Sequence, residues 1–534
     1  MERESVSRSL KRPCGGGGCG GGGAVARLLL PAAVLVLIWV GTYLRLALPE
    51  THPGGAAFRS SGPKNYSSSS SADPLLGGLL SPDFEASTCL SRYQAAIYRN
   101  PSPYSHSAYL LSRLREYEAL HRKCAPHTAL YNRSAAVLSS AAGNASAASE
   151  CQYVVWIPHN GIGNRVITIV SAFLYALLNN KVLLLYIPDD FTDLLCEPFP
   201  GATWALPADF PIRDLFRFDT ESPESFGNLL KSKSTSIDSR SYVYLHLPWY
   251  YGDWDKRFFC EDSQRTLRKV PWLLLKSDHY FVPSLFLVPE YADELRQLFP
   301  ERSAVFHHLV RYLIHPSNEV WGRVTRYYRA YLEKADERVG VQIRVFDNFP
   351  IPFEKMLEQI MSCLMGERLL PKVDEKNAAA ATSVDTKVKA VLVTYLKPGY
   401  SEKIRDVYYR RATTTGEVVG VFQPSHEESQ RTDHRDHNVK ALAEIELLSL
   451  SDALVTTAWS TFGYVAQGLG GLRPWILLRQ TQSHDACRQA ASPEPCYLMP
   501  PRPEQCFGDG GGGHAILRNV RRCEDEGGGI KLFD

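Results

Sequence analysis

The stretch that decides the fold runs from Ser451 to Arg479 and reads SDALVTTAWSTFGYVAQGLGGLRPWILLR. Residues 453–455 and 475–478 are apolar runs typical of buried strands, and residues 464–469 between them predict a short helix. Small hydroxyl residues fill the turn before that helix: Thr456, Thr457, Ser460 and Thr461. Hydroxyls and free backbone N–H groups at a helix start can hold a phosphate, so this layout is typical of a nucleotide site. An ordinary turn capped by Ser and Thr explains the same residues equally well.

Strands and helices alternate in the residues that lead up to this stretch. The predicted strands are residues 339–346, 390–395 and 417–421. The predicted helices are residues 318–334, 402–411 and 439–450. Alternation of this kind predicts an α/β fold with a mostly parallel sheet. The alanine-rich residues 378–381 fall in a predicted surface loop.

A second α/β unit lies earlier in the chain, after a predicted helix at residues 102–123. It consists of a strand, a glycine-containing loop, a helix and a strand, predicted at residues 153–157, 158–165, 166–178 and 182–186. In the loop, Gly161 and Gly163 let the backbone approach a ligand closely. Asn164 and Arg165 place polar groups at the helix start. The loop lacks the third glycine of a dinucleotide fingerprint and a Walker lysine, so it predicts neither an NAD site nor a P-loop.

Arg344 is a charge within an otherwise apolar predicted strand, in the run from Val341 to Asp347. In one interpretation the strand is at the sheet edge with Arg344 in solvent, or Arg344 pairs structurally with Asp347. In the other interpretation Arg344 lies at the carboxyl end of the sheet and forks onto a phosphate. The residues alone favour neither.

The N-terminus predicts a membrane anchor. Residues 1–27 are basic and glycine-rich, residues 28–48 are mostly Leu, Val, Ile and Ala, and residues 49–83 are rich in Gly, Ser and Pro. The apolar run approaches the roughly 20 residues that a bilayer requires. Because the cations precede it, residues 1–27 are expected in the cytosol and residues 49–83 form a flexible lumenal stem. A cleaved signal peptide is the alternative, but the apolar run is long for one.

Sequons and cysteines fit a lumenal or extracellular body. The glycosylation sequons begin at Asn65, Asn132 and Asn144. Twelve cysteines are present, and ten of them follow the predicted anchor, which predicts disulfides. Four lie in residues 481–534, so we expect bridges to staple this tail. A zinc site has less support, because no Cys-x-x-Cys pair exists.

The body is large enough for two halves. Residues 84–316 and 317–480 each carry one of the α/β units, and together they exceed one typical core. The formal net charge is only +2, which gives no reason to expect a nucleic-acid partner.

Taken together, these stretches resemble plant fucosyltransferases of the xyloglucan and arabinogalactan type. The resemblance covers nearly everything after the stem. It includes Cys89 to Gln94, Pro101 to Tyr104, Tyr153 to Leu185, Cys196 to Pro200, Tyr242 to Leu247, Val270 to Trp272, Tyr280 to Leu285, Phe306 to Leu309, Lys440 to Glu444 and Trp459 to Gly471. Gln342-x-Arg344-x-x-Asp347 is also similar to the His-x-Arg-x-x-Asp signature of the wider superfamily. Departures are Ile162 in place of Leu, Phe422 in place of His, and the added length at Ala378 to Ala381.

The resemblance implies an inverting transferase with two Rossmann-like halves that face each other across a cleft, a GT-B-like fold. The donor would be GDP-β-L-fucose, and the acceptor O2 of a terminal galactose, or arabinose, on a cell-wall glycan. Arg344 would hold the β-phosphate as the catalytic residue. The implied donor-binding residues are Arg344, Asp347, Ser460, Thr461, Phe462 and Gly463. The implied acceptor-side residues are Asn160, Gly161, Gly163, Asn164 and Arg165.

No obligatory metal and no cofactor are expected. Asp253 and Asp255 match the acidic triplet of metal-dependent glycosyltransferases, and Asp433, His434, Asp436 and His437 also cluster. Acidic clusters are usually solvated, and the resemblance assigns the metal's role to an arginine and amides. We expect a single-pass type II protein of the Golgi membrane and allow for a homo-oligomer. Two alternatives stay open: a transferase with another acceptor, such as protein Ser/Thr, and an anchored glycan-binding protein without catalysis.

Overall fold

The computed structural model describes part of the chain, which comprises residues 73–139, 150–233, 237–379, 381–383, 385–479, 485–502, 506 and 519–534. The predicted tail, anchor and most of the stem lie outside these residues, as do Asn65 and Asn144. Within the described part, no helix combines the length and apolarity that crossing a bilayer requires. Leu79 and Leu80, which fall in the predicted stem, are buried against the body.

A four-stranded parallel sheet forms the centre of the first half, by which we mean the described residues up to 316. Its strands are β1 (Tyr153–Ile157), β2 (Val182–Leu185), β3 (Tyr242–Leu247) and β4 (Trp272–Ser277), in the order β2-β1-β4-β3. All five side chains of β1 are buried, which explains the continuous apolar run in the sequence. The two strands predicted here are confirmed to within one residue.

The first half contains the following helices, of which the first, residues 90–98, contacts Trp321 and Tyr328 of the second half through Tyr98. They are α2 (Leu90–Tyr98), α3 (Ala108–Lys123), α4 (Ala129–Ser139), α5 (Ile162–Leu178), α6 (Phe226–Lys231), α7 (Asp253–Lys256), α8 (Glu261–Arg268), α9 (Val282–Leu285), α10 (Ala292–Leu298) and α11 (Val305–Leu313). Short 3₁₀ turns are η1 (Ala86–Thr88), η2 (Asp189–Phe191), η3 (Leu215–Arg217), η4 (Arg257–Phe259), η5 (Pro289–Tyr291) and η6 (Arg302–Ala304).

A six-stranded sheet forms the second half, residues 317–479, together with one strand of the tail. Its strands are β5 (Glu337–Gln342), β7 (Val388–Thr394), β9 (Val418–Phe422), β10 (Ala453–Thr457), β11 (Trp475–Leu477) and β12 (Arg488–Gln489). The order is β12-β11-β10-β5-β7-β9, and only β12 is antiparallel. The mostly parallel sheet predicted from the alternating pattern is therefore confirmed.

The second sheet also has helices on its faces and a small hairpin. The helices are α12 (Asn318–Tyr327), the π-helical η7 (Tyr328–Leu332), α13 (Phe353–Gly366), α14 (Tyr400–Arg410), α15 (Arg435–Ser449) and α16 (Thr461–Gly470). β6 (Val373–Ala378) pairs with β8 (Arg411–Thr413), so the predicted alanine-rich loop begins inside a strand. β13 (Val520–Arg522) and β14 (Ile530–Leu532) pair in the tail.

Several element boundaries differ from the prediction. The strand predicted at 339–346 ends at Gln342, and it is central because β10 and β7 flank it, so the edge-strand interpretation of Arg344 is wrong. Helices α5 and α16 begin at Ile162 and Thr461, one turn earlier than expected. Helix α3 begins late, because the prolines before it disfavour helix and Ser107 caps it by accepting from the Leu110 N–H.

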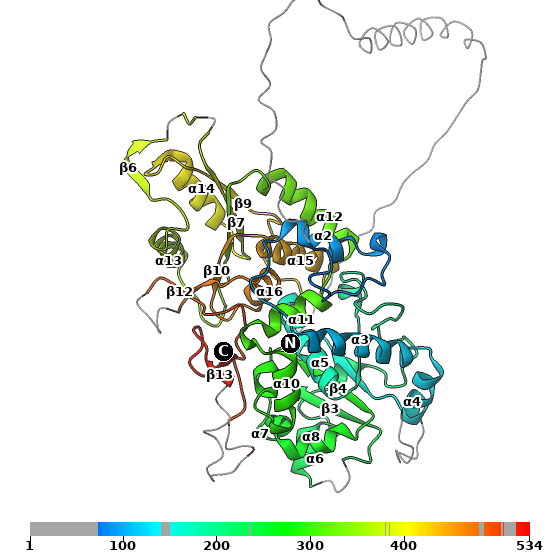
Figure 1. Cartoon of the computed structure of the whole chain (residues 1–534). Helices are drawn as coiled ribbons and strands as arrows, with labels where there is room; N and C mark the ends of the chain where they lie inside the picture. Colours follow the sequence, from blue (N-terminus) through cyan, green and yellow to red (C-terminus); the bar gives the residue numbers. More distant parts are fainter. Residues whose placement is uncertain are drawn as a thin grey trace, which may run out of the picture. The chain divides into compact units, whose positions relative to one another are not determined.

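The two halves share a buried core. Val170 of α5, Leu309 of α11 and Val465 of α16 belong to one cluster of buried apolar side chains. Figure 1 shows these three helices in the region between the strands of the two sheets. Because α5 comes from the first half and α16 from the second, this packing fixes the first turns of both helices against each other.

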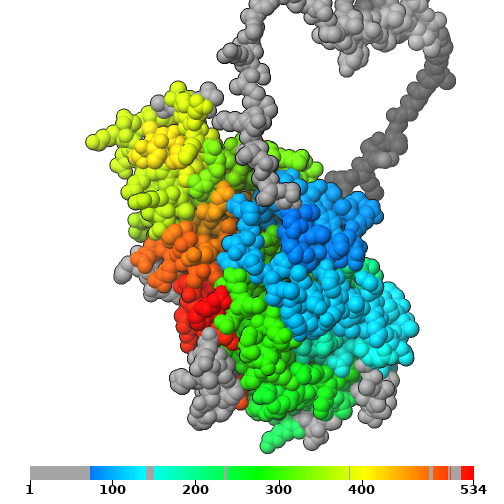
Figure 2. All heavy atoms as spheres, viewed as in Figure 1, coloured from blue at the N-terminus to red at the C-terminus, as the bar shows by residue number. Residues whose placement is uncertain are grey.

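All ten cysteines after the predicted anchor form disulfides, as the sequence predicts. The pairs are Cys89–Cys196, Cys124–Cys151, Cys260–Cys506, Cys363–Cys487 and Cys496–Cys523. The four tail cysteines form one bridge within the tail, one to the first half and one to the second. In Figure 2 the last residues, in red, lie between orange residues of the second half and green residues of the first.

Candidate active site

A cavity of about 780 Å³ opens where the carboxyl ends of strands from both sheets face each other. Residues 159–164 follow β1, Trp249 and Tyr250 follow β3, and Asp278 follows β4. From the second half, Arg344 follows β5 and residues 459–462 follow β10. Ligands of open parallel sheets bind at this end of the strands. The cavity is therefore the candidate active site.

The wall from the first half is organised around Asp278, which is buried. One carboxylate oxygen accepts from the Asn160 amide at 2.8 Å, and the other accepts from the Trp249 N–H at 2.8 Å. The Asn164 amide donates to the Asp278 carbonyl at 3.0 Å. Burial raises the pKa of Asp278 to about 6. The carboxylate thus ties together the loops that follow β1, β3 and β4.

Arg165 has a different place from its neighbours in the predicted motif. Its guanidinium pairs with Asp190 and donates to the carbonyls of Asn160 and Thr432, and its side chain is not among those that line the cavity. The arginine therefore supports the glycine-containing loop from behind, whereas Asn160, Gly161, Gly163 and Asn164 reach the cavity.

Arg344 lines the cavity from the loop after β5. Its backbone N–H donates to Thr457 Oγ1 at 2.9 Å, which fixes the loop to the end of β10. Its guanidinium donates to Gln430 Oε1 at 2.8 Å. Burial lowers the pKa of Arg344, and the charge of Asp347 opposes this shift; an arginine stays protonated in either case. Among the described residues that line the cavity, Arg344 is the only arginine or lysine.

Asp347 lies outside the cavity. Its side chain is 89% exposed and pairs with Lys397 at 3.2 Å. The described contacts thus include no ion pair between Asp347 and Arg344, which weakens the interpretation of Arg344 as a structural partner of this carboxylate. The role of Asp347 in donor binding stays a prediction.

The first turn of α16 forms the rest of the donor-side wall. Ser460, Thr461 and Phe462 line the cavity, and the Ser460 side chain makes no capping hydrogen bond. Gly463 packs behind them, where an added Cβ would lie 2.9 Å from Thr456. The N–H groups at the start of a helix have no partner within the helix, and the helix dipole favours anions there.

The first turns of α5 and α16 meet at the cavity. A Cβ built on Gly163 would lie 2.7 Å from the Phe462 backbone nitrogen and 2.7 Å from Thr461 Oγ1. Thr461 Oγ1 donates to Asn164 Oδ1 at 3.1 Å across the same contact. Gly163 is therefore required for close helix packing, and the predicted acceptor-side and donor-side motifs touch each other.

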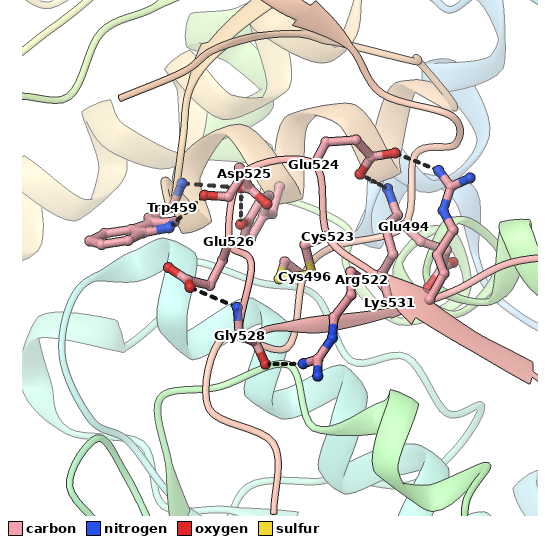
Figure 3. The surroundings of a disulfide bond; sticks show 12 residues. Trp459, Glu494, Cys496, Arg522, Cys523, Glu524, Asp525, Glu526, Gly528 and Lys531 are labelled. Carbon is pink, nitrogen blue, oxygen red and sulfur yellow. Dashed lines mark hydrogen bonds and ion pairs between the residues drawn. A yellow bond between two sulfur atoms is a disulfide. The ribbon is translucent and has the colours of Figure 1, made fainter. Parts of the chain in front are cut away.

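The tail contacts Trp459, a residue that lines the cavity, and Figure 3 shows Asp525 of the tail beside it. Trp459 has a left-handed backbone, with φ of 66°. Its backbone N–H donates to Asp525 Oδ2 at 3.2 Å, and its indole N–H donates to the Asp525 carbonyl at 2.9 Å. The Tyr464 hydroxyl donates to the same carboxylate at 2.5 Å. The disulfide of Cys496 and Cys523 holds this segment of the tail beside the cavity.

Sequence reasoning did not identify Trp249, Tyr250, Asp278 or Asp525. Asp278 had a detectable signal, because it follows a buried strand directly and so lies at the carboxyl edge of a sheet. Asp525 had none, since its contacts with Trp459 depend on the path of an irregular tail.

The acidic residues of the two candidate metal clusters are not among the residues that line the cavity. Asp253 pairs with Lys256 at 3.0 Å, and Asp255 accepts from the Gly252 N–H at 3.2 Å, so both stabilise α7. Asp436 pairs with Lys440 at 3.0 Å and with Arg323 at 3.2 Å. Of the second cluster, His437 lines the cavity, 3.3 Å from Glu427.

One predicted glycosylation site lies within the described residues. Asn132 is exposed on α4, whereas Ser134 of the same sequon is buried and donates to the Cys151 carbonyl at 3.3 Å.

Comparison with known proteins assigns a family. Residues 55–506 match the model of the xyloglucan fucosyltransferase family. A galactoside 2-alpha-L-fucosyltransferase of Pisum sativum is 51% identical over 467 residues, which cover 86% of this chain and 82% of that protein. A protein of the same name from Arabidopsis thaliana is 50% identical over 466 residues, which cover 86% and 83%.

A solved structure agrees with these matches. The chain is similar to a point mutant of Arabidopsis thaliana FUT1 in complex with GDP, with a TM-score of 0.79 and 49% identity. The superposition covers 86% of this chain and all of that one.

Proposed function

Because the chain belongs to the xyloglucan fucosyltransferase family, we propose that it transfers L-fucose from GDP-β-L-fucose to O2 of a terminal galactose and forms an α-1,2 linkage. It is a fucosyltransferase, as its relatives at about half identity are. The single observation that carries the mechanism is Arg344, the one permanent cation on the cavity wall among the described residues.

The leaving diphosphate is the group that requires charge stabilisation. Fucose departs with oxocarbenium character, so negative charge develops on the β-phosphate as the bond to the sugar breaks. A guanidinium can fork onto two phosphate oxygens, and Arg344 is held at the carboxyl edge of β5 for this role by Thr457 and Gln430. The first turn of α16 supplies backbone donors and the favourable end of a helix dipole beside it.

The galactose binds against the wall that Asp278 organises. Asn160 and Asn164, both held by hydrogen bonds to Asp278, offer neutral polar groups suited to sugar hydroxyls. With the donor on the second half and the acceptor on the first, the attacking O2 approaches opposite to the leaving diphosphate. This arrangement gives inversion at the fucose carbon and corresponds to a GT-B-like pair of Rossmann halves.

The direct test is transfer by the lumenal body in the presence of GDP-fucose and galactose-terminated xyloglucan. We expect a product with fucose linked α-1,2 to galactose, and arabinogalactan and a Ser/Thr-containing protein serve as competing acceptors. A product only on protein, or glycan binding without turnover of GDP-fucose, would overturn the proposal in favour of the alternative activities.

No metal is required in this proposal, since Arg344 and the α16 amides supply the positive charge. We expect full transfer in excess chelator. Loss of activity that manganese or magnesium restores would assign a role to acidic residues such as Asp253 and Asp255.

The cellular setting follows from the sequence alone. We propose a Golgi type II membrane protein with residues 28–48 as the anchor and the body in the lumen, where Cys89 and the nine later cysteines can oxidise. A mobility shift on glycosidase treatment and protease protection in intact vesicles test this, and an unglycosylated, protease-accessible body would contradict it.

A further inference from the structure

Tyr250 is a large aromatic side chain left in solvent at the cavity wall. It follows β3 and is 82% exposed, the largest exposed fraction among the large apolar side chains of the described residues. Its backbone is left-handed, with φ of 70°, a conformation that is costly for a bulky residue. An exposed ring and a strained backbone both oppose stability, so the surrounding structure must impose them.

Both neighbours of Tyr250 are firmly anchored. Trp249 donates its N–H to the buried Asp278 at 2.8 Å. Tyr251 is 3% exposed, shares a hydrogen bond with the Tyr497 hydroxyl at 2.8 Å and donates to the Met499 carbonyl at 2.6 Å. Strain of this kind persists only where the surroundings over-determine it, and such residues cluster at ligand-binding sites.

The chemistry of this wall suits an uncharged ligand with apolar faces. The rings of Trp249 and Tyr250 meet edge to face, with centroids 5.9 Å apart. They belong to the first half, whereas the cation that suits a diphosphate, Arg344, belongs to the second. Pyranose rings offer flat C–H faces that pack on aromatic rings and remove apolar area from water.

The difference in burial between Asp278 and Tyr250 indicates two separate positions for sugar rings in the cavity. Asp278 is 5% exposed and lies deep in the wall, beside the place proposed for the reacting galactose. Tyr250 lines the same cavity but is 82% exposed, so a ring that contacts it belongs to the next part of the acceptor chain.

We propose that Tyr250, supported by Trp249, is an acceptor subsite that stacks against a sugar ring other than the galactose that receives fucose. The subsite rests on the proposed function and extends it, because it selects galactose presented on a longer glycan over galactose on a short one. The ring of Tyr250 provides the contact, and its hydroxyl is secondary.

The test compares initial rates with a galactose-terminated disaccharide and a galactose-terminated xyloglucan oligosaccharide. For Tyr250→Ala we expect the KM of the oligosaccharide to rise about 5- to 20-fold, the effect of losing part of a buried aromatic contact. The KM of the disaccharide and of GDP-fucose should stay unchanged, and Tyr250→Phe should retain the unaltered values. Tyr409→Ala is the matched control, because Tyr409 is 81% exposed on α14 and is not among the cavity-lining residues.

Three outcomes would overturn the subsite. An equal rise in KM for both acceptors would place Tyr250 at the reacting galactose. A rise only in the KM of GDP-fucose would mean that Tyr250 contacts the guanine base. Unchanged KM values would mean that Tyr250 contacts no substrate. If the unaltered enzyme hydrolyses GDP-fucose but fucosylates neither acceptor, the proposed function fails separately. Calorimetric titration of the oligosaccharide in the presence of GDP then decides the subsite, and equal affinities for the unaltered and Tyr250→Ala proteins would exclude it.

Discussion

Arg344 lies in a loop, two positions after the end of β5, and lines the cavity. The sequence predicted its residue type and its place at the carboxyl end of a sheet, yet left open whether Asp347 would neutralise it. The described contacts pair Asp347 with Lys397, so the guanidinium keeps most of its donors for a ligand. Asp278, on the opposite wall, could be predicted only as a polar residue after a strand, because its partners Asn160, Asn164 and Trp249 follow two other strands of the sheet.

Arg344→Lys should be nearly as damaging as Arg344→Ala. Lysine keeps the charge but cannot fork onto two phosphate oxygens. Loss of this contact should lower kcat about 100- to 1,000-fold, by analogy with deleted oxyanion donors. The measurement is kcat for each variant, with thermal melts to confirm folding and Ser460→Ala as a milder comparison. A folded Arg344→Lys variant that keeps most of its activity would exclude the forked contact.

Activity should fall as the pH drops below about 6, where Asp278 takes up a proton. The protonated carboxyl accepts less well from Asn160 and Trp249, so the loops of the first half lose their common partner.

Because burial raises this pKa, ionisation of Asp278 costs folding stability: the native state binds the proton more tightly than the unfolded state. Its contribution to stability is therefore greatest at low pH and is lost as the pH rises towards 6. As the pH falls through about 6, activity should therefore decrease while the contribution of Asp278 to folding stability increases.

Asp278→Asn provides the check. The NH₂ group of the new asparagine would face one of the two donors, the Asn160 amide or the Trp249 N–H, and could not accept from it. We expect kcat/KM to drop about 10- to 100-fold, as for the loss of a hydrogen bond to a charged group. The variant should also lack the limb near pH 6. An unchanged acidic limb in the variant would assign it to another group.

At the scale of elements, helices α5 and α16 determine the site, since their first turns meet at the cavity. The alternation of strands and helices predicted both helices, because buried strands read as apolar runs and the long helices as periodic ones. Their starts were placed one turn late, since glycine and hydroxyl residues in a first turn look like loop residues. That error concealed the contact between Gly163 and Phe462, which joins two segments about 300 residues apart in the chain.

Gly163→Ala should separate these helices and weaken donor binding. The added methyl would meet backbone atoms of Thr461 and Phe462 below 3.0 Å, which no side-chain rotation relieves. We expect a destabilisation of about 1–3 kcal/mol, as for an overpacked core, together with a higher Kd for GDP. Gly366→Ala on α13 is the control, because nothing lies within 4 Å of its added Cβ. Denaturant melts and GDP titrations measure both effects, and equal behaviour of the two variants would contradict the packing argument.

At the scale of the whole molecule, the tail holds the two halves and the donor wall together. Its four cysteines form three bridges that the sequence could not pair, since ten cysteines allow many connectivities and only the folded path selects one. The sequence predicted a stapled tail. The sequence could not predict that Asp525 holds Trp459 and Tyr464 at the cavity, because the tail is irregular and its residues show no periodic pattern.

Removal of two disulfides with equal sequence separation allows an effect on stability to be distinguished from an effect on donor binding. Cys124–Cys151 and Cys496–Cys523 each have a sequence separation of 27, so their removal should cost similar chain entropy, about 3–4 kcal/mol. We expect both Cys→Ser double variants to melt at lower temperature by comparable amounts. Only the Cys496 and Cys523 variant should also raise the KM for GDP-fucose, because it releases Asp525 from Trp459. Equal KM values in the two folded variants would contradict a role of the tail in donor binding.

The position of Asp525 along the chain has a consequence for biosynthesis. Every strand of both sheets, β12 included, is translated before this carboxylate leaves the ribosome. A nascent chain that ends after Gln489 and before Asp525 therefore carries both sheets and lacks the partner of Trp459. Such a truncated translation product should consume no nucleotide sugar, so catalytic competence arrives only after Asp525 has been synthesised.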